Sequence, residues 1–146
     1  MGAENNVSDA QSRIALGEAR RADRKAATQK ARDEQYAKDL EDIERLESEH
    51  GEDRVSVLTT PSFVEGLPTV VILRTPDKPR FDRFRTQVRK AGHNTEAIGS
   101  AKDMLASSCL IFPDEAIYAK MRESWPSIHD SVGNEAVRLG EAEGKK

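Results

Sequence analysis

The chain has 146 residues, of which 34% are charged and 36% hydrophobic, and its formal net charge at pH 7 is −3. No apolar run approaches the roughly 18 residues that a membrane-spanning helix needs, and residues 1–12 lack the pattern of a signal peptide. The single cysteine, Cys109, excludes a disulfide framework and a multi-cysteine metal site.

Large apolar residues are distributed unevenly along the chain. Leu, Ile, Val and Phe number 29, about 20% of the chain, close to the level below which a chain cannot bury a core. Only 6 of them fall in residues 1–50, whereas 23 fall in residues 51–146. We therefore predict a charged helical arm over residues 1–50 that is partly disordered alone, a compact domain over residues 51–140, and a solvated tail over residues 141–146.

The arm favours one long helix. Residues 8–50 contain no proline and are rich in Ala, Arg, Lys, Glu and Gln, which are good helix formers. Ser8 is the predicted N-cap, and His50 followed by Gly51 is the predicted end. The part up to about residue 30 is predicted to be helical when it binds a partner and frayed or disordered alone. Four larger apolar side chains of the arm can pack on the following domain: Tyr36, Leu40, Ile43 and Leu46.

Charge is segregated along this helix. Residues 13–32 contain seven basic and two acidic side chains, and residues 33–49 contain eight acidic and two basic ones. This order opposes the helix macrodipole, which favours acids at the start and bases at the end. The segment is either a solvated charged helix or a helix whose charges face an antiparallel or different partner. The candidate partner contacts on the arm are Arg20, Arg21, Arg24, Tyr36, Leu40 and Ile43.

Two short β-branched segments follow the arm. Residues 54–60 and 69–75 are too short for helices and are predicted to pair as an antiparallel hairpin. The segment between them, residues 61–68, has two prolines and a glycine, which is typical of a loop. Two strands alone are marginally stable, so helices must cover them.

About four short helices are predicted after the hairpin. The first is capped by Asp77 and buries Phe81 and Phe84, and the second is capped by Thr95 and carries an apolar stripe that continues to Phe112. Two more are predicted over residues 115–125 and 127–140, the last closed by Gly140. The predicted fold class is therefore α+β and mostly helical.

The most concentrated positive charge lies in residues 74–90, which carry seven basic and two acidic side chains. Nucleic-acid binders use such strips to neutralise phosphates, but no zinc knuckle, aromatic sheet motif or helix-turn-helix pattern accompanies this one. We expect a solvated or protein-contacting face, with nucleic-acid binding as the lesser alternative. The candidate contacts are Arg80, Arg83 and Arg85.

No residue constellation indicates catalysis. His50, His93 and His129 are far apart in the sequence, and His129 is expected to be exposed in the first turn of a helix. Cys109 lies on an apolar stripe and is expected to be a buried hydrophobic residue. Since no glycine-rich phosphate loop or nucleophile motif is present, we expect neither an enzyme nor a cofactor or metal site.

Aromatic residues near the C-terminus have two interpretations. Trp125, just before Pro126, and Tyr118 are predicted to form the joint between the last two helices. In the alternative, Tyr118 and Trp125 are anchors for a partner protein.

Four short motifs occur along the compact domain: Leu73-Arg74-Thr75-Pro76, Phe81-x-x-Phe84-Arg85, Cys109-Leu-Ile-Phe-Pro113 and Trp125-Pro126. With these motifs, residues 69–140 resemble small tail assembly chaperones of long-tailed phages. These chaperones usually lack a long charged arm, so residues 1–50 depart from their pattern.

The resemblance implies a non-enzymatic function in virion assembly. Such a chaperone keeps the tape measure protein soluble and recruits tail tube subunits in the host cytoplasm, without contacting a membrane. The alternative is a structural head or tail protein of the virion, whose N-terminal arm binds neighbouring capsid or tail subunits. A homo-oligomer is compatible with both interpretations.

Overall fold

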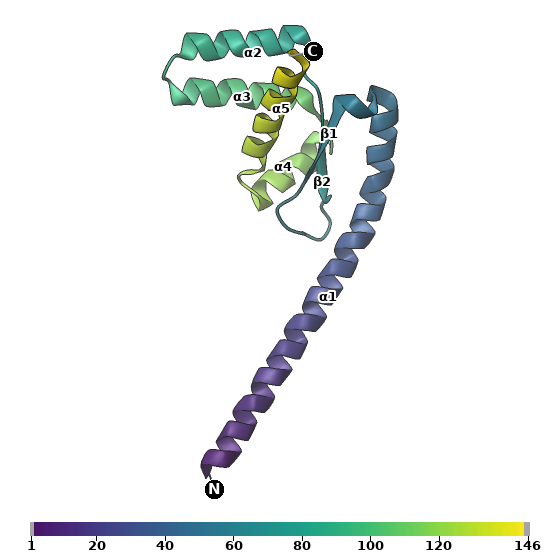
Figure 1. Ribbon diagram of the computed structural model, residues 1–146, viewed down its shortest axis with the longest axis vertical. Helices are drawn as coiled ribbons and strands as arrows, with labels where there is room; N and C mark the ends of the chain where they lie inside the picture. The colour runs from purple at the N-terminus through teal and green to yellow at the C-terminus, as the bar shows by residue number, and fades with distance from the viewer. Residues whose placement is uncertain (1, 145–146) are drawn as a thin grey trace.

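The computed structural model describes residues 2–144, with side chains described from residue 7 to residue 142. A long helix, α1 (Gly2–His50), leads into a small domain and extends far beyond it (Figure 1). A short 3-10 turn, η1 (Glu52–Arg54), joins α1 to the domain. The mostly helical α+β class predicted from the sequence is confirmed. The other elements are β1 (Val55–Thr59), β2 (Val70–Arg74), α2 (Lys78–Ala91), α3 (Thr95–Cys109), β3 (Leu110–Phe112), α4 (Glu115–Ser124) and α5 (Ile128–Gly144).

Helix α1 is longer than the sequence predicts. It begins at Gly2, so Ser8 lies inside the helix and is not its N-cap. The predicted C-terminal end is confirmed, because α1 stops at His50 and Gly51 has a φ of 95°. Gly51 closes the last turn by donating its N–H to the carbonyl of Glu47 at 2.9 Å. Within the described residues, no helix is long and apolar enough to cross a membrane.

The sheet has three antiparallel strands in the order β1-β2-β3. The predicted hairpin is confirmed, with Val55 opposite Arg74 and Thr59 opposite Val70. The third strand, β3, is not predicted from the sequence, which favours an apolar helical stripe that continues to Phe112. Helix α3 instead ends at Cys109, and Leu110 pairs with Leu73.

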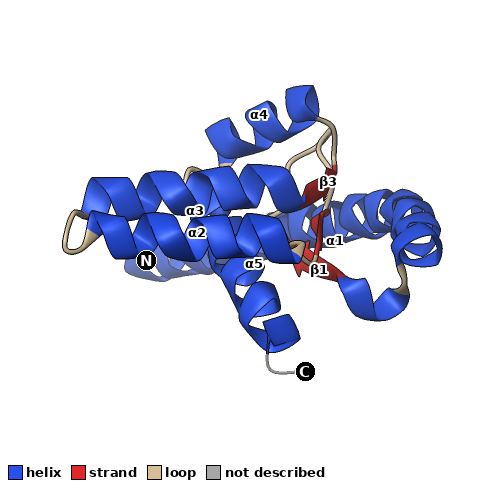
Figure 2. Cartoon of the chain, turned by 90° about the horizontal axis from the view of Figure 1, so that it is seen from above, coloured by secondary structure: helices blue, strands red, loops and turns tan. Residues whose placement is uncertain are grey.

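Both faces of the central strand β2 are covered. Val71 and Leu73 belong to the main core cluster, whereas Val70 and Ile72 belong to a second cluster with Ile43 of α1. Because neighbouring residues of a strand point to opposite faces, β2 is apolar at four consecutive positions. Figure 2 shows the strands between α1 on one side and helices α2, α3 and α5 on the other.

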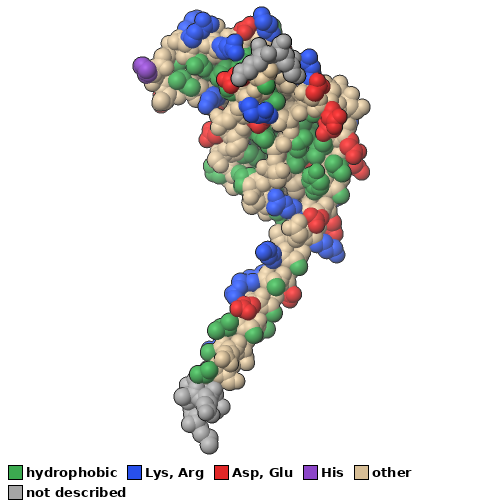
Figure 3. Space-filling view, viewed as in Figure 1, with side chains coloured by type: hydrophobic (Ala, Val, Ile, Leu, Met, Phe, Trp, Pro, Cys, Tyr) green, Lys and Arg blue, Asp and Glu red, His purple; other side chains and the backbone are tan. Residues whose placement is uncertain are grey.

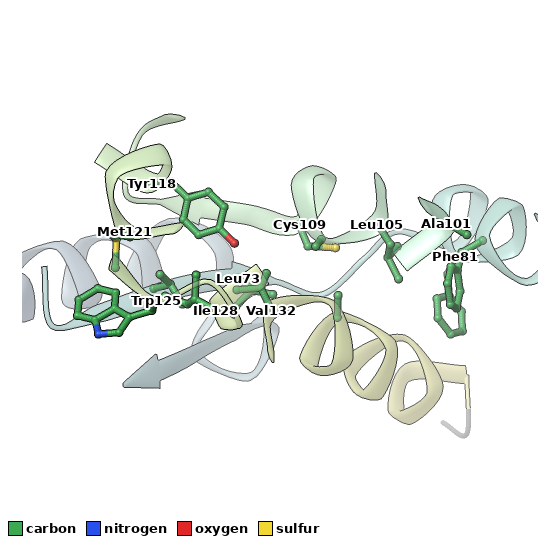
Figure 4. Packing of buried hydrophobic residues seen from close by; sticks show 14 of the residues in the cluster. Leu73, Phe81, Ala101, Leu105, Cys109, Tyr118, Met121, Trp125, Ile128 and Val132 are labelled. Carbon is green, nitrogen blue, oxygen red and sulfur yellow. The ribbon is translucent and has the colours of Figure 1, made fainter. Parts of the chain in front are cut away.

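The main core lies between the sheet and helices α2–α5. Its side chains run in a row from Trp125 past Leu73 and Cys109 to Phe81 (Figure 4). Gly140 of α5 contacts the Phe81 ring so closely that a Cβ at this position would overlap the ring. Gly140 is therefore a packing glycine, and the prediction that it ends the helix is wrong.

Since α5 continues to Gly144, the predicted solvated tail is helical over residues 141–144. The last two predicted tail residues, 145 and 146, lie outside the described residues.

Side-chain caps fix where the shorter helices begin. Asp77 accepts from the N–H of Arg80 at the start of α2, as predicted, and Asp114 accepts from the N–H of Ile117 at the start of α4. Helix α3 is capped by Asn94 rather than by Thr95, because the side-chain Oδ1 of Asn94 accepts from the N–H of Ala97 at 3.2 Å.

Candidate protein-interaction surfaces

A buried carboxylate attaches α1 to the sheet. Asp39 is 2% exposed, and its Oδ2 accepts two hydrogen bonds of 2.7 Å, from the N–H and the hydroxyl of Thr69. Its Oδ1 accepts a third bond, of 3.0 Å, from Gln35. Ile43 and Leu46 are buried beside it against β2. Of the four apolar arm residues predicted to pack on the domain, Ile43 and Leu46 do so, and Ile43 is therefore not accessible to a partner in this structure.

The part of α1 before residue 31 projects away from the domain (Figure 3). Three large apolar side chains are exposed on it, Val7, Ile14 and Leu16, with exposed fractions between 52% and 59%. Val7 and Ile14 are seven residues apart and lie on the same face of the helix. The predicted contacts Arg20, Arg21 and Arg24 are exposed on the same projecting part. We call residues 7–30 the projecting arm.

A second exposed surface lies on α1 where the helix passes the domain. Tyr36 is 45% exposed and Leu40 is 38% exposed, so these two predicted contacts do not pack fully on the sheet. Exposed carboxylates follow the same stretch at helical spacing. We call this surface the acidic face of α1; its residues are Asp33, Tyr36, Leu40, Glu41 and Glu44.

A third surface is a groove along the seam between α2 and α3. Two adjoining hollows share Gln87, Ala101 and Met104, so they form one continuous groove. Met104 is 58% exposed, and Phe84 lies in the floor. We call this surface the α2–α3 groove; its basic rim is formed by Arg80, Arg83 and Lys90. Met104 lies off the buried stripe of α3, a signal of exposed apolar surface that sequence analysis missed.

The basic residues of the predicted strip do not share one face. Arg80 and Arg83 line the α2–α3 groove, whereas the Arg85 guanidinium lies over the Phe81 ring, 4.8 Å from its centre. Arg85 lines a separate hollow beside Gly140. The positive charge is therefore divided between surfaces that a straight phosphate backbone does not contact together.

Trp125 and Tyr118 are buried, which confirms the core interpretation of both residues. They are 6% and 7% exposed, and both belong to the main core cluster. The Trp125 indole donates to the hydroxyl of Ser62 at 2.8 Å, so its one polar atom is paired. These two predicted partner contacts thus lie inside the domain in this structure.

The expectation that His129 is exposed is wrong. His129 is buried, and its Nδ1 lies 2.6 Å from the Tyr118 hydroxyl. Its Nε2 faces a carboxylate oxygen of Asp103 at 3.7 Å, which favours the tautomer that leaves Nδ1 to accept from Tyr118. Burial lowers the pKa of His129, and burial raises the pKa of Tyr118 to about 12. The partner of this histidine lies 11 residues away in the sequence, so no local pattern indicates the pair.

Cys109 is buried, as predicted, and burial raises the pKa of its thiol, which keeps it in the unreactive form. Within the described part of the chain, no three His, Cys, Asp or Glu side chains are grouped closely enough to hold a metal ion.

No protein-family model matches this chain, and neither curated proteins nor solved structures include a significant match. Its surfaces must therefore be interpreted from their own chemistry.

Proposed function

We propose that this protein is a non-enzymatic assembly factor that binds a helical partner protein through its projecting arm. The observation that carries the proposal is the exposure of Val7, Ile14 and Leu16 on the projecting arm, the part of α1 that extends away from the domain. Val7 and Ile14 lie on one face of the arm and Leu16 lies on the opposite face, so Val7 and Ile14 together can pack against an apolar stripe of a helical partner.

The size of the apolar surface indicates reversible binding. Full burial of a Val, Leu or Ile side chain contributes about 1.5–3 kcal/mol, so side chains that are about half exposed contribute about 1 kcal/mol each. Val7 and Ile14, which share a face, therefore supply about 2 kcal/mol to one contact before the cost of association. A contact of this strength suits a chaperone that releases its partner.

The narrower proposal is a phage tail assembly chaperone, which the sequence resemblance supports. In that function the arm covers an apolar stripe of the tape measure protein until tail tube subunits replace it. The alternative, a structural virion protein, is favoured by the length of the arm, because such arms also extend between subunits of an assembled particle.

Co-expression with a phage tail tape measure protein tests the chaperone proposal. The wild-type chain should increase the soluble fraction of the tape measure protein, and the double substitution Val7→Glu, Ile14→Glu should abolish the increase. The matched control is Ser8→Glu, Ser12→Glu, which adds the same charge to the arm without removing an apolar side chain. An unchanged soluble fraction with the wild-type chain would refute the proposal.

Mass spectrometry of purified particles separates the two functions. A chaperone is released before the particle matures, so its peptides should be absent from mature virions. Stoichiometric amounts of the chain in mature virions would establish the structural alternative instead.

A further inference from the structure

Two surfaces of this protein are complementary to each other but cannot meet within one copy. The acidic face of α1 exposes Tyr36 and Leu40 among carboxylates, and the α2–α3 groove exposes Met104 among basic residues. The sheet lies between α1 and the pair α2 and α3 (Figures 1 and 2). We propose that the acidic face of α1 in one copy of this chain docks into the α2–α3 groove of a second copy.

The charges on the two surfaces support this occupant. Glu41 and Glu44 on the acidic face are exposed, and within the described part of the chain neither forms an ion pair. Arg83 and Lys90 on the groove rim are likewise exposed and have no ion pair among the described residues. Two surfaces of opposite charge attract each other, and repulsion disfavours binding of either surface to its own kind.

Each of the two surfaces also exposes apolar side chains that the contact would bury. Tyr36, Leu40 and Met104 account for three of the large hydrophobic side chains that the domain and the adjoining part of α1 leave exposed. Met104 is unbranched and flexible, which lets it adapt to a helix placed across it. We therefore expect Tyr36 and Leu40 of the acidic face to pack against the apolar floor of the groove, which Phe84 and Met104 form.

The dimensions also agree. Helix α2 has 14 residues and is about 21 Å long, so the groove beside it accommodates roughly four turns of helix. The acidic face extends over residues 33–44, about 18 Å of α1. Asp39 and Leu46 hold the opposite side of α1 on its own sheet, so the docking face is presented without any rearrangement.

The contact is heterologous, because it joins two different surfaces. Each copy keeps one groove and one acidic face for a further copy, so the assembly forms a ring or an open chain. The projecting arm is not part of the contact and extends from every copy. Self-assembly and partner binding by the arm are therefore separate properties with separate tests.

Sedimentation velocity over a range of protein concentrations, at low salt, measures the self-association. The small apolar patch makes the contact weak, so association should increase with concentration and decrease when salt screens the charges. Leu40→Glu removes an apolar side chain from the acidic face, and Met104→Glu places a carboxylate in the groove. Each substitution alone should raise the dissociation constant at least about tenfold. Leu16→Glu, the same change on the projecting arm, is the matched control and should leave association unchanged.

A mixing experiment tests the heterologous geometry. The Leu40→Glu chain retains an intact groove, and the Met104→Glu chain retains an intact acidic face. An equimolar mixture of the two should therefore form a heterodimer that grows no further. This rescue also shows that both variants are folded, because a misfolded chain would supply neither surface.

Three results would overturn the proposal. The first is a wild-type chain that remains monomeric at every concentration. The second is association that Leu40→Glu and Met104→Glu leave intact or that Leu16→Glu abolishes. The third is a mixture of the two variants that remains monomeric. A failure of the co-expression experiment with unaltered self-association would refute the assembly function and leave this contact in place.

Discussion

Replacing Asp39 with alanine tests how the long helix is attached to the domain. The carboxylate is 2% exposed and accepts both polar hydrogens of Thr69, each at 2.7 Å. Alanine removes these bonds and leaves the backbone N–H of Thr69, itself a buried residue, without a partner. The Thr69 hydroxyl can turn toward another acceptor, but the N–H cannot.

The size of the effect follows from three contributions. A hydrogen bond to a charged group contributes about 1.5–3 kcal/mol, and a buried donor left unpaired costs about 1–3 kcal/mol. These overlap, because both refer to the same N–H. They are partly offset, because the buried carboxylate pays a desolvation cost that alanine does not. We therefore expect Asp39→Ala to lower the free energy of unfolding by about 2–3 kcal/mol.

Urea denaturation followed by circular dichroism measures this change, and amide exchange at Thr69 locates it. Asp39→Asn keeps one acceptor without the charge and should cost about half as much. Asp33→Ala is the matched control: Asp33 is exposed and, among the described residues, accepts one side-chain hydrogen bond, from Gln29, so its loss should change stability by less than about 0.5 kcal/mol. If Asp39→Ala is as stable as this control, the carboxylate does not hold α1 on the sheet.

Two further predictions concern the main core. Gly140→Ala should lower the free energy of unfolding by about 1–3 kcal/mol, because the new Cβ overlaps the Phe81 ring, whereas Gly99→Ala, which has open space, should be neutral or stabilising in urea denaturation. His129 has a lowered pKa in the folded state, so the unfolded chain binds more protons below about pH 6.5 and stability should fall as the pH decreases. The groups that face it are Tyr118, Asp103, Arg122 and Asp130. Denaturation from pH 7 to pH 5 should show a smaller slope for His129→Asn, and a slope equal to that of the wild type would show that other groups cause the loss.

The sequence predicted the elements whose signals are local. The absence of proline over 8–50 predicted α1, and β-branched segments around a proline-rich loop predicted the β1–β2 hairpin. Asp77 and the spacing of Phe81 and Phe84 predicted the start and buried side of α2. Each of these signals depends on residues within a few turns of one another, so the chain need not be folded for them to be recognised.

The errors arise where a distant residue changes the role of a local one. A glycine near the end of a helical pattern usually marks a C-cap, but Gly140 is inside α5 because the Phe81 ring occupies the space of its side chain. A histidine in the first turn of a helix is usually exposed, but His129 is buried because the Tyr118 hydroxyl provides a hydrogen-bond partner for its Nδ1 in the interior. The three residues of β3 are too few to show a period, and their pairing with β2 alone makes them a strand.

One candidate surface can be predicted from the sequence, whereas the others depend on the tertiary structure. The exposed apolar and charged residues of the projecting arm follow from the sequence, because a helix with so few large apolar residues cannot bury itself. The α2–α3 groove, the division of the basic strip and the exposure of Tyr36 and Leu40 depend on which helices lie side by side. Periodicity determines which residues share a face of one helix, but only the packing of α1 on the sheet and of α2 on α3 decides which faces remain open.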